Sequence, residues 1–117
     1  MSNKVETGFY GQDIAEEYLL NKGMKLLEAN FRTRQSEIDL IMQDGEYIVF
    51  IEVKYRRSLK YGLPREAIST SKQKKILHAA KYYASRSNAE QDYRFDVVEI
   101  IETNKDLQIN HIENAFW

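Results

Sequence analysis

The sequence predicts an α/β domain in which a mixed central β-sheet is flanked by two helices. Segments 7–22 and 71–85 carry apolar residues at helical spacing, and an Asp44-Gly45 pair joins two runs that are rich in β-branched and aromatic residues. Two further β-rich runs follow at 93–102 and 107–112. The order is one helix, three strands, a second helix and two strands. It predicts a mixed sheet with two helices and one face open for a ligand.

Length and composition indicate a single domain, residues 1–117. With 43% hydrophobic and 30% charged residues, the chain can build one core and is too short for two. It contains no cysteine, which excludes disulfides and thiolate metal sites. The N-terminus lacks an apolar signal core, and no stretch approaches the roughly 20 apolar residues of a membrane span. We therefore expect a cytoplasmic protein without a membrane partner.

The first helix is predicted over 7–22 because its apolar residues recur at helical spacing: Tyr10, Ile14, Tyr18 and Leu19. Gly23 provides a stop at the C-terminal end of this helix. Segment 24–32 has a weaker strand pattern, since Asn30 interrupts the alternation of apolar and polar residues.

Segments 36–42 and 47–56 are predicted to form a β-hairpin. If Asp44 and Gly45 form a two-residue loop, Gln43 pairs with Glu46 and Asp39 lies opposite Phe50. Further along, Glu37 then lies opposite Glu52, and Gln35 lies opposite Lys54. The other face of the hairpin is expected to be core and to hold Ile38, Leu40, Val49, Ile51 and Val53.

The rest of the chain is predicted to hold two helical segments and a second hairpin. Residues 64–68 favour a short helical turn that begins at Pro64. Ser71 is predicted to cap a longer helix that ends near Ser85 and buries Ile76, Leu77, Ala80 and Tyr83. A polar turn at 103–106 joins the last two strands.

Charge is distributed unevenly along the chain. The formal net charge is only -1, yet residues 54–86 hold ten basic residues and one acidic residue, Glu66. A basic block on an otherwise acidic protein is typical of binding to the phosphate backbone of a nucleic acid. For Lys72, Lys74 and Lys75 a solvated helix face is an equally good interpretation, so phosphate binding stays one of two alternatives.

The predicted hairpin places Asp39 and Glu52 as diagonal neighbours on one face, with Lys54 one step further along. Like charges that are packed on a sheet repel each other, so Glu37, Asp39 and Glu52 require a compensating cation or another strong reason to persist. Carboxylate oxygens without cysteine or paired histidines favour Mg²⁺ or Mn²⁺. This chemistry predicts hydrolysis of a phosphodiester, with Lys54 orienting a water or stabilising negative charge.

Arg56, Arg57 and Lys60 follow directly and are predicted to contact the nucleic-acid backbone beside the cleavage point. Taken singly, Asp39 is better explained as a satisfied strand-edge carboxylate, and Glu52 with Lys54 as an exposed charge pair. Their convergence on one face is what favours a site. His78 and His111 have no acidic or serine partner at useful spacing, so neither is assigned a role.

Two of these segments resemble the split Asp, Glu-X-Lys motif of the PD-(D/E)XK nuclease superfamily: Glu37-Ile-Asp39-Leu-Ile and Phe-Ile-Glu52-Val-Lys54. More closely, the chain resembles the YraN family of small bacterial proteins, which is related to Holliday-junction resolvases. The resemblance covers nearly the whole chain through Gly11-Gln-Asp-Ile-Ala15, Asn30-Phe-Arg32, Gly62-Leu-Pro-Arg-Glu66-Ala, Lys72-Gln73, Arg94-Phe-Asp96-Val and His111-Ile-Glu-Asn-Ala-Phe116.

The resemblance implies a restriction-endonuclease-like core with Asp39 and Glu52 as metal ligands and Lys54 as the catalytic lysine. It also implies that Gln73 lies near the site. Relatives carry an acidic residue at the position of Gln12, and this residue is thought to join the metal shell. Gln12 can coordinate through its oxygen without charge, which should weaken Mg²⁺ binding unless Glu16 takes over.

Three functions follow as hypotheses. The first is a Mg²⁺- or Mn²⁺-dependent endonuclease acting on DNA, with branched or flapped structures as candidate substrates. The second is a non-catalytic nucleic-acid-binding module in which Gln12 has disabled the metal chemistry. The third is an interaction subunit of a DNA-processing complex, for which salt-dependent affinity for DNA would be absent. A homodimer is suggested only by analogy with the resolvases.

Overall fold

The structure is a computed structural model that describes residues 3–57, 68–86, 91–104 and 106–116, with side chains described from Tyr10 onward. Two helices and five strands are described: α1 Asn3–Asn21, β1 Lys25–Arg32, β2 Glu37–Asp44, β3 Tyr47–Arg56, α2 Thr70–Ser85, β4 Asp92–Glu102 and β5 Leu107–Ile112. The predicted order of elements is confirmed. Neither described helix is both long and apolar enough to span a membrane.

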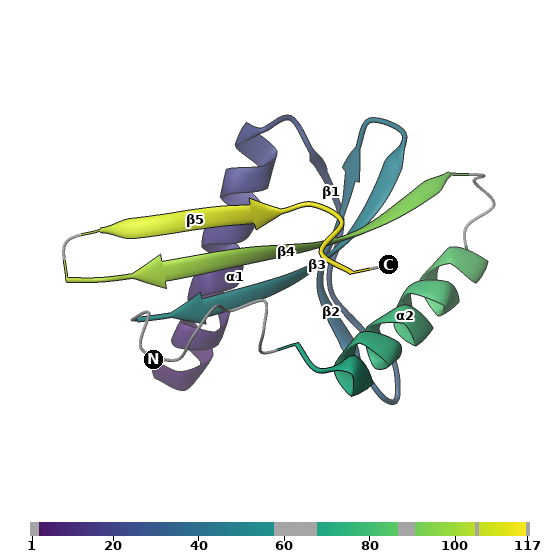
Figure 1. The fold of residues 1–117 in the computed structure, drawn as a ribbon, viewed down its shortest axis with the longest axis horizontal. Helices are drawn as coiled ribbons and strands as arrows, with labels where there is room; N and C mark the ends of the chain where they lie inside the picture. The colour runs from purple at the N-terminus through teal and green to yellow at the C-terminus, as the bar shows by residue number, and fades with distance from the viewer. Residues whose placement is uncertain (1–2, 58–67, 87–90, 105, 117) are drawn as a thin grey trace.

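The five strands form one mixed sheet in the order β1-β2-β3-β4-β5 (Figure 1). Neighbouring strands are antiparallel except β3 and β4, which run parallel. The chain between these two strands carries α2, as a parallel pair requires a crossover connection. The predicted α/β class is therefore confirmed, and the architecture is compatible with a restriction-endonuclease-like core.

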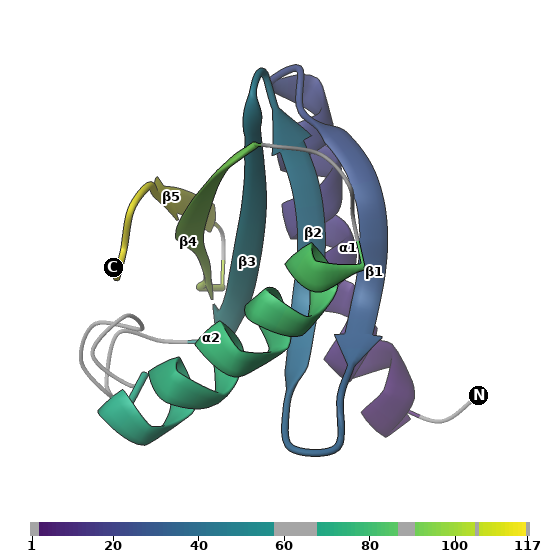
Figure 2. The ribbon, with the colours of Figure 1, turned by 90° about the vertical axis from the view of Figure 1, so that its right-hand side faces the viewer.

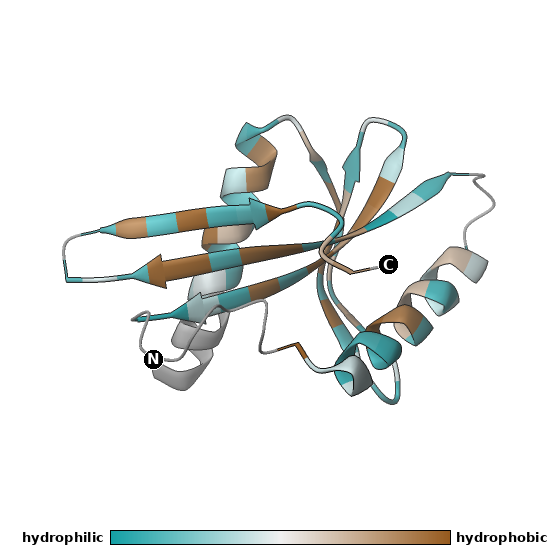
Figure 3. Cartoon of the chain, in the orientation of Figure 1, coloured by the Kyte–Doolittle hydropathy of each residue, from teal (hydrophilic) through white to brown (hydrophobic). Residues whose placement is uncertain are grey.

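Both faces of the sheet are covered, so the expectation of one open face is wrong. Helix α1 lies on one face and α2 on the other (Figure 2). The α1 side buries Ala15, Leu19, Met24, Leu40, Met42, Val49, Ile51, Val98 and Ile100. The α2 side buries Phe31, Ile38, Ile41, Ile48, Phe50, Ile76, Ala79, Ala80 and Phe95. Apolar residues accordingly run along the strands and recur on α2 (Figure 3).

Helix α2 covers the second face of the sheet because that face carries apolar as well as polar residues. Ile41 and Phe50 form a cross-strand pair on the face that also carries Asp39 and Glu52. Phe50 is only 2% exposed, because α2 packs over it. That face is therefore apolar at one end and polar at the other. The predicted clean separation of polar and apolar faces is wrong.

The hairpin of β2 and β3 differs in register from the prediction. Asp44 pairs with Tyr47, so the loop consists of Gly45 and Glu46. Gly45 has φ 61° at the first loop position, where a side chain would be strained. The shift amounts to two residues, which leaves every β3 side chain on its predicted face. Ile38 differs, because it lies opposite Phe31 and joins the core beneath α2.

The ends of the helices follow local chemistry. Gly23 ends α1 with φ 96°, as predicted, and the helix begins earlier than expected, at Asn3. Helix α2 is capped by Ser69 rather than Ser71, because the Ser69 hydroxyl oxygen accepts a 3.1 Å hydrogen bond from the backbone amide of Lys72. The helical turn predicted at 64–68 lies almost wholly outside the described residues.

Candidate functional site

The site begins where β2 and β3 separate. Their ladder ends at the pair Leu40 and Ile51, and one step beyond it Asp39 faces Glu52. The Asp39 carboxylate there accepts a 2.8 Å hydrogen bond from the backbone amide of Val53. This hydrogen bond to a side chain thus takes the place of a backbone hydrogen bond between the two strands. It holds the acid of β2 against the middle residue of the Glu52-Val53-Lys54 segment.

Two lysines contact Glu52, which is itself only 6% exposed. Lys72 Nζ, from the first turn of α2, donates a 2.6 Å hydrogen bond to Glu52 Oε1. Lys54 Nζ lies 3.4 Å from the same oxygen. The carboxylate of Glu52 is therefore held between a strand lysine and a helix lysine.

These groups open into a polar cavity of about 390 Å³. Its walls come from the turn before β2, from β2 and β3, and from the beginning of α2. The described residues that line it are Gln35, Ser36, Glu37, Asp39, Glu52, Ser69, Ser71, Lys72 and Lys75. The cavity thus combines buried carboxylates with cations and hydroxyls at a helix N-terminus, where backbone amides favour anions.

The electrostatics of the cavity are those of two acids close together. Burial and the neighbouring charge of Glu52 raise the pKa of Asp39 to about 7, although the Val53 amide and Lys72 act in the opposite direction. Burial opposes the charged form of Lys72, but the hydrogen bond to Glu52 and the charges of Glu52 and Asp39 together outweigh it and raise the Lys72 pKa. Burial and the nearby Glu52 charge therefore disfavour the ionised form of Asp39.

The donor set fits a hard divalent cation. Asp39 and Glu52 offer carboxylate oxygens, and a bound cation would offset both the burial and the Glu52 charge that raise the pKa of Asp39. Glu37 also lines the cavity and forms an ion pair with Arg32 at 3.4 Å. Neither cysteine nor histidine is among the described lining residues, which favours Mg²⁺ or Mn²⁺ over zinc.

The structure brings Asp39, Glu52 and Lys72 together in the cavity, which Lys75 also lines. Lys54 is not a lining residue and joins the group through its 3.4 Å contact with Glu52. Two other predicted members lie differently. Gln12 is 8% exposed on α1, which packs on the opposite face of the sheet, and it is not among the lining residues. Gln73 donates its side-chain amide to the Ile68 carbonyl at 3.2 Å and does not line the cavity either.

The remaining basic residues lie outside the cavity. Lys74 is exposed on α2 and is not a lining residue. Arg56 ends β3 half-buried, and Arg57 follows it exposed. Lys60 lies outside the described residues. Glu16, suggested as a substitute for Gln12, is half-buried on α1 and is not a lining residue.

Sequence patterns did not indicate three polar lining residues, Ser36, Ser69 and Ser71, as members of the site. Ser69 could have been found from its position before a helical pattern, as an alternative cap to Ser71. Ser36 reaches the cavity only because the turn between β1 and β2 folds toward α2. No local pattern in the sequence indicates that approach.

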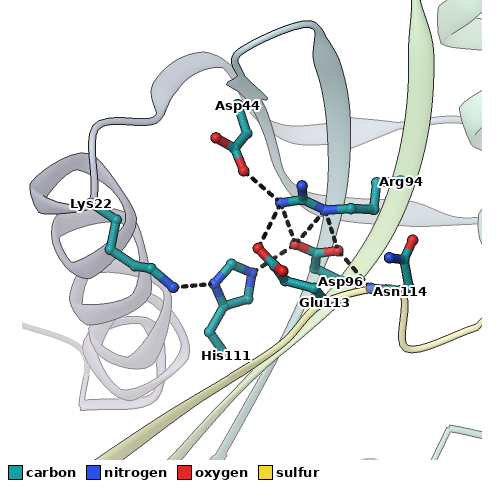
Figure 4. Close-up of polar contacts among 7 residues, drawn as sticks. All are labelled: Lys22, Asp44, Arg94, Asp96, His111, Glu113 and Asn114. Carbon is teal, nitrogen blue, oxygen red and sulfur yellow. Dashed lines mark hydrogen bonds and ion pairs between the residues drawn. The ribbon is translucent and has the colours of Figure 1, made fainter.

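A second polar cluster joins β4 to the C-terminal segment (Figure 4). Sequence patterns missed it, because they showed no acidic partner for His111. His111 Nε2 lies 2.6 Å from Asp96 Oδ2, and its Nδ1 lies 2.9 Å from Lys22 Nζ. Because the Lys22 ammonium can only donate, Nδ1 accepts and Nε2 donates to Asp96. The acidic partner of His111 is thus fifteen positions away in sequence and comes close through the β4–β5 hairpin.

Asp96 is fully buried and serves as the centre of this cluster. Arg94 donates to both of its oxygens, at 3.0 and 3.2 Å from Nε, and the backbone amide of Asn114 donates at 3.1 Å. Hydrogen bonds from His111 and Arg94 outweigh burial and lower the Asp96 pKa. Ligand atoms of Asp96, His111 and Glu113 lie within 4.8 Å of one another, but a cation there would have to displace Arg94. The cluster therefore has a structural role, because it ties the C-terminal segment to β4.

Comparison with known proteins places the chain in a family. The family model described as "Uncharacterised protein family UPF0102" matches residues 11–100. A UPF0102 protein of Thermodesulfovibrio yellowstonii is 47% identical over 114 residues, covering 97% of this chain and 98% of the relative. UPF0102 proteins of Clostridioides difficile and Rhodococcus opacus are 45% and 42% identical, each covering 99% of this chain and 100% of the relative. The chain therefore belongs to the UPF0102 family, which is the YraN family.

Proposed function

We propose that this protein is a metal-dependent endonuclease that hydrolyses phosphodiester bonds of DNA. The observation that carries the proposal is the hydrogen bond from the Val53 amide to Asp39, which joins the acid of β2 to the Glu52-Val53-Lys54 segment of β3. Through it, Asp39 and Glu52 meet Lys72 in one polar cavity, and Lys54, which does not line the cavity, lies 3.4 Å from the Glu52 carboxylate. Such a group suits the cleavage of a charged ester.

Asp39 and Glu52 would hold Mg²⁺ or Mn²⁺, since they are the paired acids of the cavity. When bound, the cation would polarise the scissile phosphate and lower the pKa of a water. Gln12 lies on α1 and does not line the cavity, so it is not included among the proposed ligands.

The two lysines would act on the phosphate. Lys54 Nζ is close to Glu52 and 21% exposed as a side chain, so it can orient a water or neutralise negative charge that develops on the phosphorus oxygens. Lys72 is 43% exposed and belongs to the first turn of α2, so it can exchange Glu52 for a phosphate oxygen. Lys75 adds a further positive charge at the rim. Outside the cavity, the bound nucleic-acid strand would be contacted by Arg56, Arg57, Lys60 and Lys74, and Gln73 would lie near it.

Two observations favour a second candidate, a nucleic-acid-binding module without catalysis. Lys72 Nζ already provides Glu52 with a positive charge at 2.6 Å, and the residue at position 12 is an uncharged glutamine. If this internal cation is never displaced, the cavity binds phosphate but no metal. The two functions differ in their requirement for a divalent ion.

Cleavage of labelled linear, flap and four-way-junction DNA tests the proposal. The natural protein, Asp39→Ala and Lys54→Ala are incubated with Mg²⁺, Mn²⁺ or EDTA. Lys74→Ala is the control, because Lys74 is an exposed lysine outside the cavity. We expect metal-dependent cutting that is lost in the two site variants and kept in the control. Salt-sensitive binding without cutting by any form would instead support the binding module.

A further inference from the structure

A second cavity continues the first along α2. It measures about 340 Å³ and is lined by Thr33, Arg34, Gln35, His78 and Tyr82. Gln35 lines this cavity and the Asp39 cavity alike. The two cavities are therefore adjacent, and we call them together the α2 groove. It leads away from the Asp39–Glu52 pair.

One wall of the α2 groove is a single stripe of helix α2. Ser71, Lys75, His78 and Tyr82 are separated by four, three and four positions, which places them on one face of the helix. At about 1.5 Å of rise per residue, Tyr82 lies roughly 15 Å along the helix axis from Lys72. A ligand that fills both cavities must be elongated.

The other wall is the turn between β1 and β2, which its own hydrogen bonds hold in shape. The Thr33 amide donates to the Ser36 carbonyl at 2.8 Å, and the Thr33 hydroxyl oxygen accepts from the Ser36 amide at 3.2 Å. Arg34 and Gln35 are the exposed residues at the tip of this turn. The groove is thus built from a fixed turn and a fixed helix.

The far end of the groove carries an aromatic ring and cations. Tyr82 is 50% exposed, and its ring is backed by Phe31 at 6.1 Å between centroids. The Arg86 guanidinium lies over the Tyr82 ring, 5.8 Å from its centroid, so a base stacked on that face would take the place of Arg86, and Arg34 lines the cavity. No carboxylate is among the described residues that line this second cavity. An exposed ring beside arginines suits a base together with its phosphate.

We propose that the α2 groove binds an unpaired segment of nucleic acid next to the scissile phosphate, with a base stacked on Tyr82. Arg34 and Lys75 would contact backbone phosphates, while Gln35 and His78 offer hydrogen bonds to a base edge. A base inside a duplex is stacked on its neighbours and cannot lie on Tyr82, so the substrate has a single-stranded segment a few nucleotides from the cut. This inference rests on the proposed function for its position relative to cleavage.

Binding in EDTA tests the groove independently of catalysis. The probes are a fluorescently labelled single-stranded oligonucleotide and a blunt duplex of the same sequence. Removing a stacking ring costs about 1–3 kcal/mol per base, so Tyr82→Ala should weaken single-strand binding by roughly 5- to 150-fold. Tyr82→Phe keeps the ring and should bind like the natural protein. Lys81→Ala, an exposed residue of α2 outside the groove, is the control for Arg34→Ala.

A 2-aminopurine placed at successive positions of the oligonucleotide locates the stacked base. Quenching should occur at one position, persist in Tyr82→Phe and disappear in Tyr82→Ala. Equal affinity of all forms for the single strand, or quenching that survives Tyr82→Ala, would overturn the groove. Loss of quenching in Tyr82→Ala with no cleavage by any form would retain the groove and reject the nuclease. Cleavage that is unaffected by Tyr82→Ala and Arg34→Ala would retain the nuclease and reject the groove.

Discussion

Asp39 and Val53 are joined by a hydrogen bond of 2.8 Å from the Val53 backbone amide to the Asp39 carboxylate. The bond forms where the ladder between β2 and β3 has ended, so it replaces a contact between the strands. Because Val53 stands between Glu52 and Lys54, the bond sets the position of Asp39 relative to both. The candidate site is therefore a consequence of the separation of two core strands.

Removal of Lys72 should strengthen metal binding and weaken DNA binding. Lys72 Nζ lies 2.6 Å from Glu52 Oε1 and competes with a divalent cation for that oxygen. In Lys72→Met, we expect Mn²⁺ affinity measured by calorimetry to rise several-fold, while affinity for DNA falls and its salt dependence weakens by about one phosphate contact. The control is Lys74→Met, which changes an exposed lysine of the same helix and should leave Mn²⁺ affinity unchanged. Weaker Mn²⁺ binding in Lys72→Met would mean that Lys72 supports the metal site.

Asp39 should make the metal-free protein less stable as the pH rises. Burial and Glu52 raise its pKa in the folded protein from 3.8 to about 7. Between these values the folded chain holds a proton that the unfolded chain has lost, so the free energy of unfolding falls with increasing pH. Urea denaturation in EDTA from pH 4 to 8 should show this fall in the natural protein and less of it in Asp39→Asn. Asp13→Asn, on the exposed side of α1, is the control.

Added Mg²⁺ should act against that loss of stability. Above pH 7 Asp39 is ionised and available as a ligand, whereas protons compete with the cation below that pH. The stabilisation by Mg²⁺ should therefore grow between pH 6 and 8. A stabilisation that is independent of pH would show that Asp39 is not a ligand.

The two serines at the start of α2 should differ in their effect on stability. The Ser69 hydroxyl oxygen accepts a 3.1 Å hydrogen bond from the Lys72 amide, whereas Ser71 lies inside the helix. Ser69→Ala should lower the free energy of unfolding by about 1 kcal/mol. Ser71→Ala should change it little or raise it slightly, because alanine has the higher helix propensity. Chemical denaturation of the two variants decides between these caps, and equal losses would reject Ser69.

Asp96→Asn should destabilise the fold by about 3 kcal/mol, because Arg94 would keep a buried positive charge without its main partner. Arg94 is 8% exposed as a side chain and donates to both oxygens of Asp96. Glu113→Gln is the matched control: Glu113 is 54% exposed and lies 3.5 Å from Arg94. Thermal and urea unfolding measure both variants. A loss below 1 kcal/mol in Asp96→Asn would show that the cluster does not hold the C-terminal segment.

Local patterns predicted the elements, because each of them depends on neighbouring residues. Gly23 and Asp44-Gly45 marked the end of α1 and the β2–β3 turn, and helical spacing indicated which side of α2 is buried. The register was wrong by two residues, since the Asp-Gly pair does not reveal which of its neighbours enters the loop. Because two is the period of a strand, Asp39 and Glu52 kept the same face.

Contacts between distant segments could not be predicted in this way. Nothing local to Lys72 indicates that it reaches Glu52, which lies twenty positions earlier in the chain. The pairing of His111 with Asp96 needed the register of the last hairpin, and the approach of the β1–β2 turn to α2 needed the packing of both. The expectation of an open sheet face failed for the same reason, as it ignored Phe50 beneath α2.

The central claim is that Asp39 and Glu52 together hold a divalent cation. The most direct test of it is the binding of Mn²⁺. Calorimetry at pH 8 should give one Mn²⁺ per chain for the natural protein and no measurable binding for Asp39→Asn or Glu52→Gln, with all three equally folded by circular dichroism. Unchanged Mn²⁺ binding in both variants would contradict the account, because the cation would then be held elsewhere and the cavity would be left without its proposed chemistry.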